Sequence, residues 1–540
     1  MTRVTDDVLA AAQQRHPDKP VTCASGISPS GPIHLGNLRE VMVPHLVADE
    51  IARRGVPGRH ILSWDDYDRL RKVPAGTPAS FTEHIGRPLT AVPDPCGEHE
   101  NWAEHHKEPF RAALAELGVD LVEISQTRLY TSGRYADQIV TAMRARAQIN
   151  AVLARHRTKR APDEDGAEDS PAAEEAYYPF RPYCADCGRD TTTVTAFDDE
   201  TTEISYVCAC GATTGPRPIS EVSGKLVWKV DWPMRWAFED VTFEAGGVDH
   251  SSPGSSFTVG AQLVRAVFGS QPPHYLPYSF VGTSGSAKLS GSTGTAPTPG
   301  DALQIFEAPV LRWLYARRKP NQAITLAFDH EVSRIYDEWD ALIRQVTDGQ
   351  AKPVDVVTQL RASGVAGAVL PSTPRPLPFR TLASIADITA DDEQQMLRIL
   401  RDLTPEDPLG ELGEVQPRLD RARAWVREYV APQERTRTRT EPDTALLAAL
   451  DETQRHGLKL LREGLAENWS LEGLTRLLYG VPKVQRGLPA DVAPTPELKA
   501  AQRAWFILLY RLLIGTETGP RLPTLLLALG IDRVRTLLTP

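Results

Sequence analysis

The chain has 540 residues, of which 41% are hydrophobic and 24% charged, and its formal net charge at pH 7 is −10. This length predicts three or four domains at about 150 residues each, and the composition excludes a wholly disordered or collagen-like chain. The negative charge argues against indiscriminate adhesion to nucleic acid but leaves room for a local basic surface.

No apolar run reaches the roughly 18 residues that are needed to cross a bilayer. The most apolar stretch, at residues 505–514, is broken by Arg511. The first ten residues, MTRVTDDVLA, contain no apolar signal segment. We therefore expect a cytoplasmic protein without membrane contact.

The first predicted unit lies between about residues 19 and 66. The apolar run PVTCASGI leads into a Gly/Pro turn, an amphipathic helix follows at about residues 34–54, and HILSW is a second apolar run. This order is a βαβ unit, which predicts an α/β fold with a parallel sheet and with its chemistry at the carboxyl ends of the strands. Asp65, Asp66 and Asp68 follow the second strand. They line a site, form a solvated acidic loop, or pair with the basic residues beside them, Arg69, Arg71 and Lys72.

The turn after the first strand reads SPSGPIHLGN and predicts a phosphate site. A helix begins near His34, where exposed amides and the helix dipole favour anions. His34 and Asn37 can both donate hydrogen bonds to phosphoryl oxygens, and Gly36 has no Cβ to hold a flat nucleotide away. A helix start with a solvated histidine would explain the same four letters.

Residues 98–158 are predicted to be mainly helical, and the acidic residues 160–176 to be a mobile loop. Four of the six cysteines then form two close pairs, Cys184-x2-Cys187 and Cys208-x-Cys210. In a reducing compartment, paired thiolates favour tetrahedral Zn²⁺ over disulfides. The spacing predicts a structural zinc site; four surface thiols gathered by chance are the alternative.

A second small-residue segment, SGSAKLSGSTG, occupies residues 284–294. Its amides and hydroxyls, including those of Ser290 and Ser292, are hydrogen-bond donors, and its mobility can bring Lys288 to a polyphosphate. A flexible linker with an incidental lysine is the alternative. Strand-like and helical segments are mixed over residues 225–318.

From about residue 331 to the end the pattern is mainly helical, with apolar stripes such as RAWFILLYRLL, and predicts a unit that folds by itself. Arginines gather there beside Trp425 and Tyr429. They suit phosphates and unstacked bases, or they form a solvated helix face. The seven arginines are Arg418, Arg421, Arg423, Arg427, Arg435, Arg437 and Arg439.

The two phosphate motifs together resemble the signatures of class I aminoacyl-tRNA synthetases. The letters HLGN at residues 34–37 resemble the HIGH motif, and KLSGS at residues 288–292 resembles the KMSKS loop. Four further blocks, ASGISPSGPIHLGNLRE, SWDDYDRLRKVPAG, GKLVWKVDWPMRW and DHSSPGSSFTVG, are similar to class I, archaeal-type lysyl-tRNA synthetases. The likeness runs from about residue 20 to a C-terminal end that is also similar to bacterial glutamyl-tRNA synthetases.

The resemblance implies a Rossmann-type parallel sheet with an inserted zinc-binding module and a C-terminal all-helical anticodon-binding domain. The two halves of the catalytic domain are expected at residues 1–90 and 221–330. The insertion, with helices on the acceptor-stem side and the zinc knuckle, is expected at residues 91–220, and the anticodon-binding domain at residues 331–540.

The implied reaction is ATP-dependent attachment of L-lysine to its tRNA through a lysyl-adenylate, by a monomer that uses ATP, Mg²⁺ and Zn²⁺. Two other functions stay open. A tRNA-independent adenylate-forming ligase or nucleotidyltransferase would not need the helical tail. A weakly active paralogue, with a regulatory or analogue-tolerance role, is favoured by Thr293 and Val248, which stand where the family more often has charged residues.

The resemblance also implies roles for individual residues. His34, Asn37 and Lys288 are the expected catalytic residues. The expected ATP-binding residues are Ser30, His34, Gly36, Asn37, Lys288, Ser290 and Ser292. The expected lysine-binding residues are Gly26, Ser28, Trp232, His250 and Tyr278.

A second metal site is implied between residues 94 and 105, where the family carries Asp, Cys, His and His. In this sequence the matching residues are Asp94, Glu98, His99 and His105. Glu98 therefore occupies the cysteine position, and Cys96, two residues earlier, could substitute for it. A histidine-rich solvated helix start is the alternative.

Overall fold

The computed structural model describes residues 1–15, 17–156, 177–252, 254–283, 296–489, 491–493 and 495–539. The chain divides into two compact units. The first unit comprises Met1–Leu303, Ala308–Leu326 and Lys352–Leu370, and the second comprises Gln304–Glu307, Ala327–Ala351 and Pro371–Pro540. The predicted acidic loop and the loop with Lys288, Ser290 and Ser292 lie outside the described residues.

A five-stranded parallel sheet forms the centre of the first unit, with the strand order β10-β9-β1-β2-β3. The predicted βαβ unit is confirmed, since β1 (Val21–Ile27) leads through α2 (Leu35–Arg53) to β2 (Gly58–Trp64). β9 (Phe243–Gly247) pairs with the other edge of β1, and β10 (His274–Tyr278) lies beyond it. Strand order therefore reverses at β1, and sheets of this kind bind ligands at such a reversal.

The stretch that was predicted to be mainly helical contains a strand as well. Its helices are α3 (Trp102–Glu116), α4 (Gln126–Thr131), α5 (Ala136–Arg144) and α6 (Arg146–His156). Between them, β3 (Val122–Ser125) forms the edge of the parallel sheet. Four residues with an exposed Val122 are too few to show the alternation of a strand, so the sequence pattern missed it.

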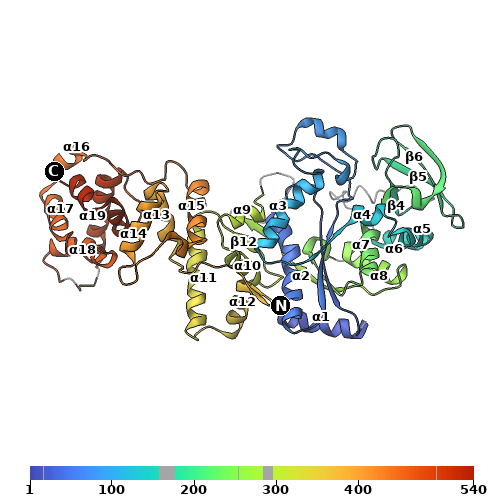
Figure 1. The fold of residues 1–540 in the computed structure, drawn as a ribbon, viewed down its shortest axis with the longest axis horizontal. Helices are drawn as coiled ribbons and strands as arrows, with labels where there is room; N and C mark the ends of the chain where they lie inside the picture. The colour runs from blue at the N-terminus through green and yellow to red at the C-terminus, as the bar shows by residue number, and fades with distance from the viewer. Residues whose placement is uncertain are drawn as a thin grey trace. The chain divides into compact units, whose positions relative to one another are not determined.

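A small β module follows these helices and shares their core. β5 (Thr192–Phe197), β6 (Glu203–Cys208) and β7 (Thr213–Pro218) form an antiparallel sheet, and β4 (Phe180–Pro182) pairs with β8 (Gly224–Leu226). Side chains of the module and of α5 and α6 belong to one hydrophobic cluster, and Figure 1 shows the module beside these helices.

The remaining elements of the first unit surround the sheet or follow it in the chain. The helices are α1 (Thr2–Arg15), α7 (Trp228–Phe238), α8 (Ser256–Ala266), α9 (Pro299–Leu303), α10 (Ala308–Ala316) and α12 (Pro353–Ser363). The short strands are β11 (Val281–Thr283), which is parallel to β12 (Ile324–Leu326), and the hairpin of β13 (Gly364–Val365) and β14 (Ala368–Val369).

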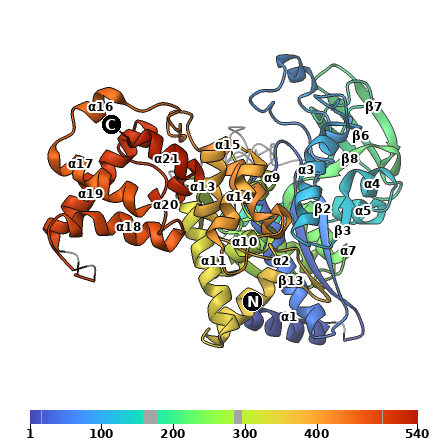
Figure 2. The ribbon, with the colours of Figure 1, turned by 60° about the vertical axis from the view of Figure 1, so that its left-hand side comes forward.

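The regular structure described in the second unit is helical, as predicted for residues 331–540 (Figure 2). The predicted boundary differs from the observed one, because Lys352–Leu370, with α12 and the hairpin of β13 and β14, belongs to the first unit. α20 is buried almost throughout, and α13, α18 and α21 pack against it. Among the described residues, none of the helices combines the length and the hydropathy that crossing a bilayer requires. The helices of the unit are α11 (Glu331–Thr347), α13 (Phe379–Thr389), α14 (Glu393–Leu403), α15 (Arg418–Tyr429), α16 (Thr444–Ala448), α17 (Glu452–Gly464), α18 (Leu471–Val484), α19 (Pro496–Ile514), α20 (Leu522–Leu529) and α21 (Ile531–Leu537).

Candidate active site and metal centres

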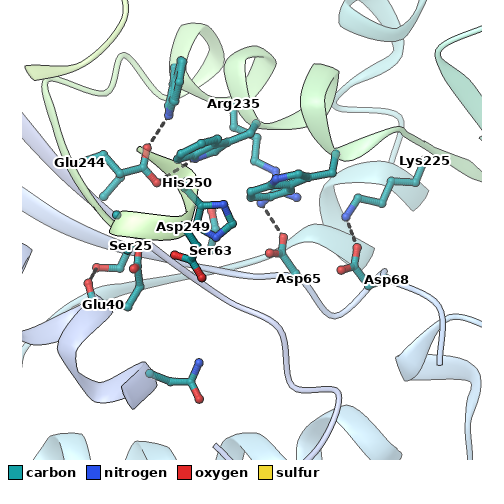
Figure 3. Close-up of a pocket in the computed structure, with 18 of the residues that line it drawn as sticks. Ser25, Glu40, Ser63, Asp65, Asp68, Lys225, Arg235, Glu244, Asp249 and His250 are labelled. Carbon is teal, nitrogen blue, oxygen red and sulfur yellow. Dashed lines mark hydrogen bonds and ion pairs between the residues drawn. The ribbon is translucent and has the colours of Figure 1, made fainter. Parts of the chain in front are cut away.

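A cavity of about 460 Å³ lies at the carboxyl ends of the central strands (Figure 3). Its lining includes Gly26 near the end of β1, Asp65 after β2, Gly247 at the end of β9 and Tyr278 at the end of β10. The first turn of α2, one face of α7 and part of the β module also line it. The cavity therefore lies at the edge of the sheet where the sequence predicts chemistry.

The HIGH-like segment forms a reciprocal cap at the start of α2. Nδ1 of His34 accepts a hydrogen bond from the backbone N–H of Gly36 at 3.0 Å, and Oδ1 of Asn37 accepts one from the backbone N–H of His34 at 3.2 Å. Because Nδ1 is an acceptor, the neutral ring carries its proton on Nε2, and the amide group of Asn37 keeps its two N–H donors. Both side chains can therefore donate into the cavity that they line.

The structure shows a second, local reason for glycine at position 36, which the sequence pattern did not reveal. A Cβ at this position would lie 2.7 Å from Cε1 and 2.8 Å from Nδ1 of His34. Real Cβ atoms do not approach other atoms so closely, so only glycine lets the histidine ring fold back onto the helix amide. Gly36 also lines the cavity, as its predicted role requires.

Two carboxylates that the sequence analysis did not single out face the same cavity. Glu40, on α2, accepts a hydrogen bond from the hydroxyl of Tyr278. Removal from water raises the pKa of Glu40 to about 8; the Tyr278 hydrogen bond opposes this shift, and the negative charges of Glu244 and Asp249 add to it. A cation that binds beside this carboxyl group favours its ionised form and lowers its pKa again.

Glu244, on β9, fixes the aromatic wall of the cavity. It is 5% exposed and accepts hydrogen bonds from the indole N–H groups of Trp232, at 3.0 Å, and Trp236. Burial raises the pKa of Glu244 to about 7. Trp232 stacks in turn on Trp228, with ring centroids 5.2 Å apart. Indole faces beside carboxylates suit a ligand with an alkyl stem and an ammonium group.

The three aspartates after β2 have different surroundings. Asp65 and Asp68 line the cavity and pair with Arg235, at 2.6 Å, and with Lys225 (Figure 3). Asp66 is fully buried and pairs with Lys107 at 2.7 Å, away from the cavity lining. The interpretation of this segment as a solvated acidic loop is therefore wrong, because its partners come from distant parts of the chain.

The structure brings most of the described candidates together. Ser28 and Ser30 are exposed in the turn and are not among the lining residues. Lys288, Ser290 and Ser292 lie outside the described residues. The predicted residues that line the cavity are Gly26, His34, Gly36, Asn37, Trp232, His250 and Tyr278.

The four predicted cysteine ligands converge in the β module. The Sγ atoms of Cys184 and Cys210 are 3.8 Å apart, those of Cys187 and Cys208 are 3.7 Å apart, and all four lie within 4.8 Å of one another. A tetrahedral site with Zn–S bonds of about 2.3 Å has sulfurs about 3.8 Å apart. The sulfurs therefore fit one Zn²⁺.

The turns that carry these cysteines have matching backbones. Gly188 follows the first pair at φ +72°, and Gly211 follows the second at φ +96°. Each glycine N–H donates to the carbonyl of the first cysteine of its pair, at 2.8 and 2.9 Å. Left-handed glycines thus close both turns and bring each cysteine pair into a two-point clamp.

The second metal group differs from its predicted composition. Asp94, Cys96, His99 and His105 bring their ligand atoms within 4.8 Å of one another, whereas Glu98 is exposed and lies outside the group. The sulfur of Cys96 is 3.4 Å from Nδ1 of each histidine. Cys96 therefore replaces Glu98, because the turn that follows it, at Gly97 with φ +79°, folds the sulfur back toward the histidines. Sulfur, imidazole and carboxylate together suit Zn²⁺.

Part of the predicted arginine patch of the second unit is structural. Arg418 is 2% exposed and pairs with Glu307 at 2.7 Å and with Asp340 at 2.9 Å. Arg423 pairs with two carboxylates at 3.0 Å. Trp425 is buried and donates its indole N–H to a backbone carbonyl. These groups hold helices together, whereas other arginines of the patch have exposed side chains.

Comparisons with known proteins agree with this geometry. Residues 1–360 match the family model of tRNA synthetases class I (K). The chain is 56% identical to a lysine–tRNA ligase of Streptomyces coelicolor, over 100% of this chain and 97% of the relative. It is 33% identical to a lysine–tRNA ligase of Thermococcus kodakarensis, over 94% of each.

A glutamate tRNA ligase structure from Elizabethkingia meningosepticum matches with 14% identity and a TM-score of 0.44, over 96% of this chain and 98% of that one. The family match confirms the predicted class I fold, with its parallel sheet and C-terminal helical region. On the motifs, the cavity and these identities, the chain belongs to the class I tRNA synthetases (K), the family of the lysine–tRNA ligases.

Proposed function

We propose that the chain attaches L-lysine to its tRNA in two steps, with a lysyl-adenylate between them. The observation that carries the choice of lysine is the cavity at the carboxyl edge of the sheet. The carboxyl groups of Glu40 and Glu244 have pKa values raised by burial, and indole rings form part of its wall. An amino acid with an alkyl stem and two ammonium groups matches this lining.

Glu40 and Asp249 are the proposed acceptors for the ammonium groups of lysine, and both line the cavity. Glu244 acts through the indoles, since its two oxygens accept the N–H groups of Trp232 and Trp236. Trp232 forms the wall for the four-carbon stem. Gly26, His250 and Tyr278 complete this subsite, and Ser28 is assigned to it from the family resemblance alone.

In the first step, a carboxylate oxygen of lysine attacks the α-phosphorus of ATP. The new bond joins that oxygen to phosphorus, the bond between the α- and β-phosphoryl groups breaks, and pyrophosphate leaves. His34 and Asn37 donate hydrogen bonds to the phosphates at the start of α2, where the helix dipole adds to them. Positioning and charge neutralisation dominate the protein's contribution to such a step.

The remaining ATP contacts are assigned from the resemblance. Lys288, Ser290 and Ser292 close over the pyrophosphate, Gly36 admits the adenosine, and Ser30 lies in the same turn. Mg²⁺ enters with ATP as the counter-ion of its phosphates and supplies further charge neutralisation.

In the second step, the 2′-hydroxyl of the terminal ribose of tRNA attacks the carbonyl carbon of the adenylate, and AMP leaves. Residues 1–90 and 221–330 form the catalytic domain in this proposal. Residues 91–220 face the acceptor stem, and residues 331–540 bind the anticodon arm. The protein acts as a monomer in the cytoplasm.

Zinc has a structural role in this account. A tetrahedral Zn²⁺ would be fully coordinated by the four thiolates of Cys184, Cys187, Cys208 and Cys210, with no position left for a substrate. Binding of the ion would then stabilise the fold. The group around Asp94 and Cys96 would hold a second ion.

The valine at position 248 leaves the neighbouring residues of the cavity wall in place. It lies at the exposed start of the short turn Val248–His250, whose next two residues, Asp249 and His250, line the cavity. This arrangement supports an active enzyme over a weakened paralogue. Thr293 lies outside the described residues.

Amino-acid-dependent ATP–pyrophosphate exchange tests the proposal. Each of the twenty amino acids is offered to the full chain, with and without lysine tRNA, and charging of the tRNA is measured in parallel. Lysine should support both exchange and charging. A preference for glutamate or arginine would overturn the choice of substrate, and exchange with lysine but without charging would favour the tRNA-independent ligase.

A further inference from the structure

A second cavity, of about 390 Å³, lies within the helical unit. It runs along one stripe of α19, which carries Lys499, Arg503 and Phe506, and is bounded by Tyr479 of α18 and by the loop that follows α19. We call this site the α18–α19 groove. The mechanism proposed above uses none of these residues.

The α18–α19 groove has a fixed aromatic floor. The rings of Tyr479 and Phe506 are 4.9 Å apart and meet edge to face, and Tyr479 keeps 47% of its surface exposed. The side-chain amide of Gln502 donates to the backbone carbonyl of Tyr479 at 3.0 Å, which ties α19 to α18. An exposed ring on a rigid base offers a stacking surface without a large loss of side-chain entropy on binding.

The loop that closes one end of the groove is also held in place. The hydroxyl of Tyr510 donates to the carbonyl of Pro520 at 2.7 Å. The loop packs closely against α19 here, since a Cβ at Gly519 would lie 2.5 Å from Cδ1 of Ile514. Gly515, at φ +77°, makes the turn out of α19. The groove is therefore formed before any ligand enters.

The charges of the α18–α19 groove favour an anion. Lys499 and Arg503, one helical turn apart, are exposed and make no ion pair with the described residues. The acidic residue in the lining, Glu517, pairs with Arg511. Two cations beside an aromatic ring are the combination that binds a base and its flanking phosphates in single-stranded nucleic acids.

We propose that the α18–α19 groove binds an unpaired nucleobase of the tRNA, with Tyr479 as the stacking surface and with Lys499 and Arg503 on the adjoining phosphates. This inference rests on the proposed function, which supplies the RNA. The groove offers a stacking ring beside exposed cations, whereas Arg418 and Arg423 of the predicted arginine patch are held in ion pairs.

Binding of a lysine tRNA transcript to the full chain tests the groove. Tyr479→Ala should raise the Kd for tRNA about tenfold, the size of one lost base stack, whereas Tyr479→Phe should keep wild-type affinity. Lys499→Ala and Arg503→Ala should each lower the slope of log Kd against log salt by about one. Lys459→Ala on α17, an exposed lysine outside the lining, is the charge-matched control and should leave the slope nearly unchanged.

Transcripts that lack one loop base at a time identify the ligand. The penalty of Tyr479→Ala should disappear on one such transcript and persist on the others. Lysine-dependent ATP–pyrophosphate exchange should stay at the wild-type rate in every groove variant, so that failure of the groove and failure of the proposed function are distinguished. Wild-type affinity of Tyr479→Ala, or a penalty that no missing base removes, would overturn the proposal; Arg503→Glu repeats the test at an exposed position where folding is not at risk.

Discussion

The cavity of the first unit and the α18–α19 groove of the second are both built from charged and aromatic side chains, but they differ in burial. In the cavity, Glu244 is 5% exposed and both of its oxygens have fixed indole partners. In the groove, Lys499 and Arg503 are exposed and make no ion pair with the described residues. A buried charge without a partner costs free energy, so a buried site favours a small ligand that supplies the partner. Exposed charges also add affinity, but salt screens this contribution.

The largest effect is expected where a buried charge of the second unit loses its partners. Arg418→Ala leaves Glu307 and Asp340 without their cation, and the loss of one member of a buried pair costs about 3–5 kcal/mol. The free energy of unfolding, from urea titration, should fall by that amount. Arg427→Ala, at a 60% exposed side chain, should change it by less than about 0.5 kcal/mol. Equal effects at the two positions would remove the distinction between buried and exposed charge.

The next effect concerns the transition state of adenylation. If Lys288 neutralises the pyrophosphate as charge develops, Lys288→Ala should lower both kcat and kcat/KM of ATP–pyrophosphate exchange about a hundredfold, or about 3 kcal/mol. The affinity for lysine should change little. An unchanged exchange rate would make Lys288 an incidental residue of its loop.

A smaller effect follows from the raised pKa of Glu40, which is about 8 in the empty cavity. An ammonium group favours the ionised carboxylate, so lysine affinity should rise by up to about tenfold per pH unit as pH increases toward 8, and then level off. Glu244, with a pKa of about 7, acts in the same direction at lower pH. Calorimetric titration should show this rise for the wild type and a flatter profile for Glu40→Gln.

The same shift has the opposite consequence for stability without lysine. A carboxyl group whose folded pKa is raised stabilises the fold fully below its ordinary value near 4.5, and this contribution is lost as pH rises through about 8. Thermal unfolding of the empty protein should therefore show a loss of stability over this range that Glu40→Gln reduces. A pH-independent difference between the two proteins would contradict the assignment.

The sequence predicted the parts of the fold that local patterns control. Apolar runs and turn residues predicted β1, α2 and β2, and cysteine spacing predicted the thiolate cluster. The charged residues of the cavity were harder to predict from the sequence, because Glu40 looks there like an ordinary solvent-exposed residue of a helix. Glu244 left a usable signal: it is a lone acidic residue inside the apolar strand Phe243–Gly247.

Other assignments failed because they depend on distant partners. The role of Arg418 is set by Glu307 and Asp340, which lie 111 and 78 residues away in the chain. No local pattern reveals such pairs. Family spacing placed Glu98 in the second metal group, but the turn at Gly97 brings Cys96 there instead.

The smallest expected effect is a change in zinc content, which distinguishes Cys96 from Glu98 as the metal ligand. Elemental analysis of the full chain should find two zinc ions, and Cys96→Ser should lose one of them, whereas Glu98→Gln should keep both. The cluster of Cys184 and Cys208, which are buried, should retain its ion longer than the group around the exposed Cys96 when a chelator is added. Loss of zinc from Glu98→Gln but not from Cys96→Ser would reverse the assignment.

Exchange kinetics with lysine and with norleucine test the central claim, that carboxylates of the cavity, above all Glu40, select the substrate by its ammonium group. Norleucine keeps the four-carbon stem and lacks the terminal charge. A site built around a polar group of its substrate rejects the analogue that lacks this group by about 10⁴-fold or more. We predict a kcat/KM for lysine at least about a thousandfold above that for norleucine in the wild type, and a much smaller ratio in Glu40→Gln. A wild-type ratio below about tenfold would contradict the account.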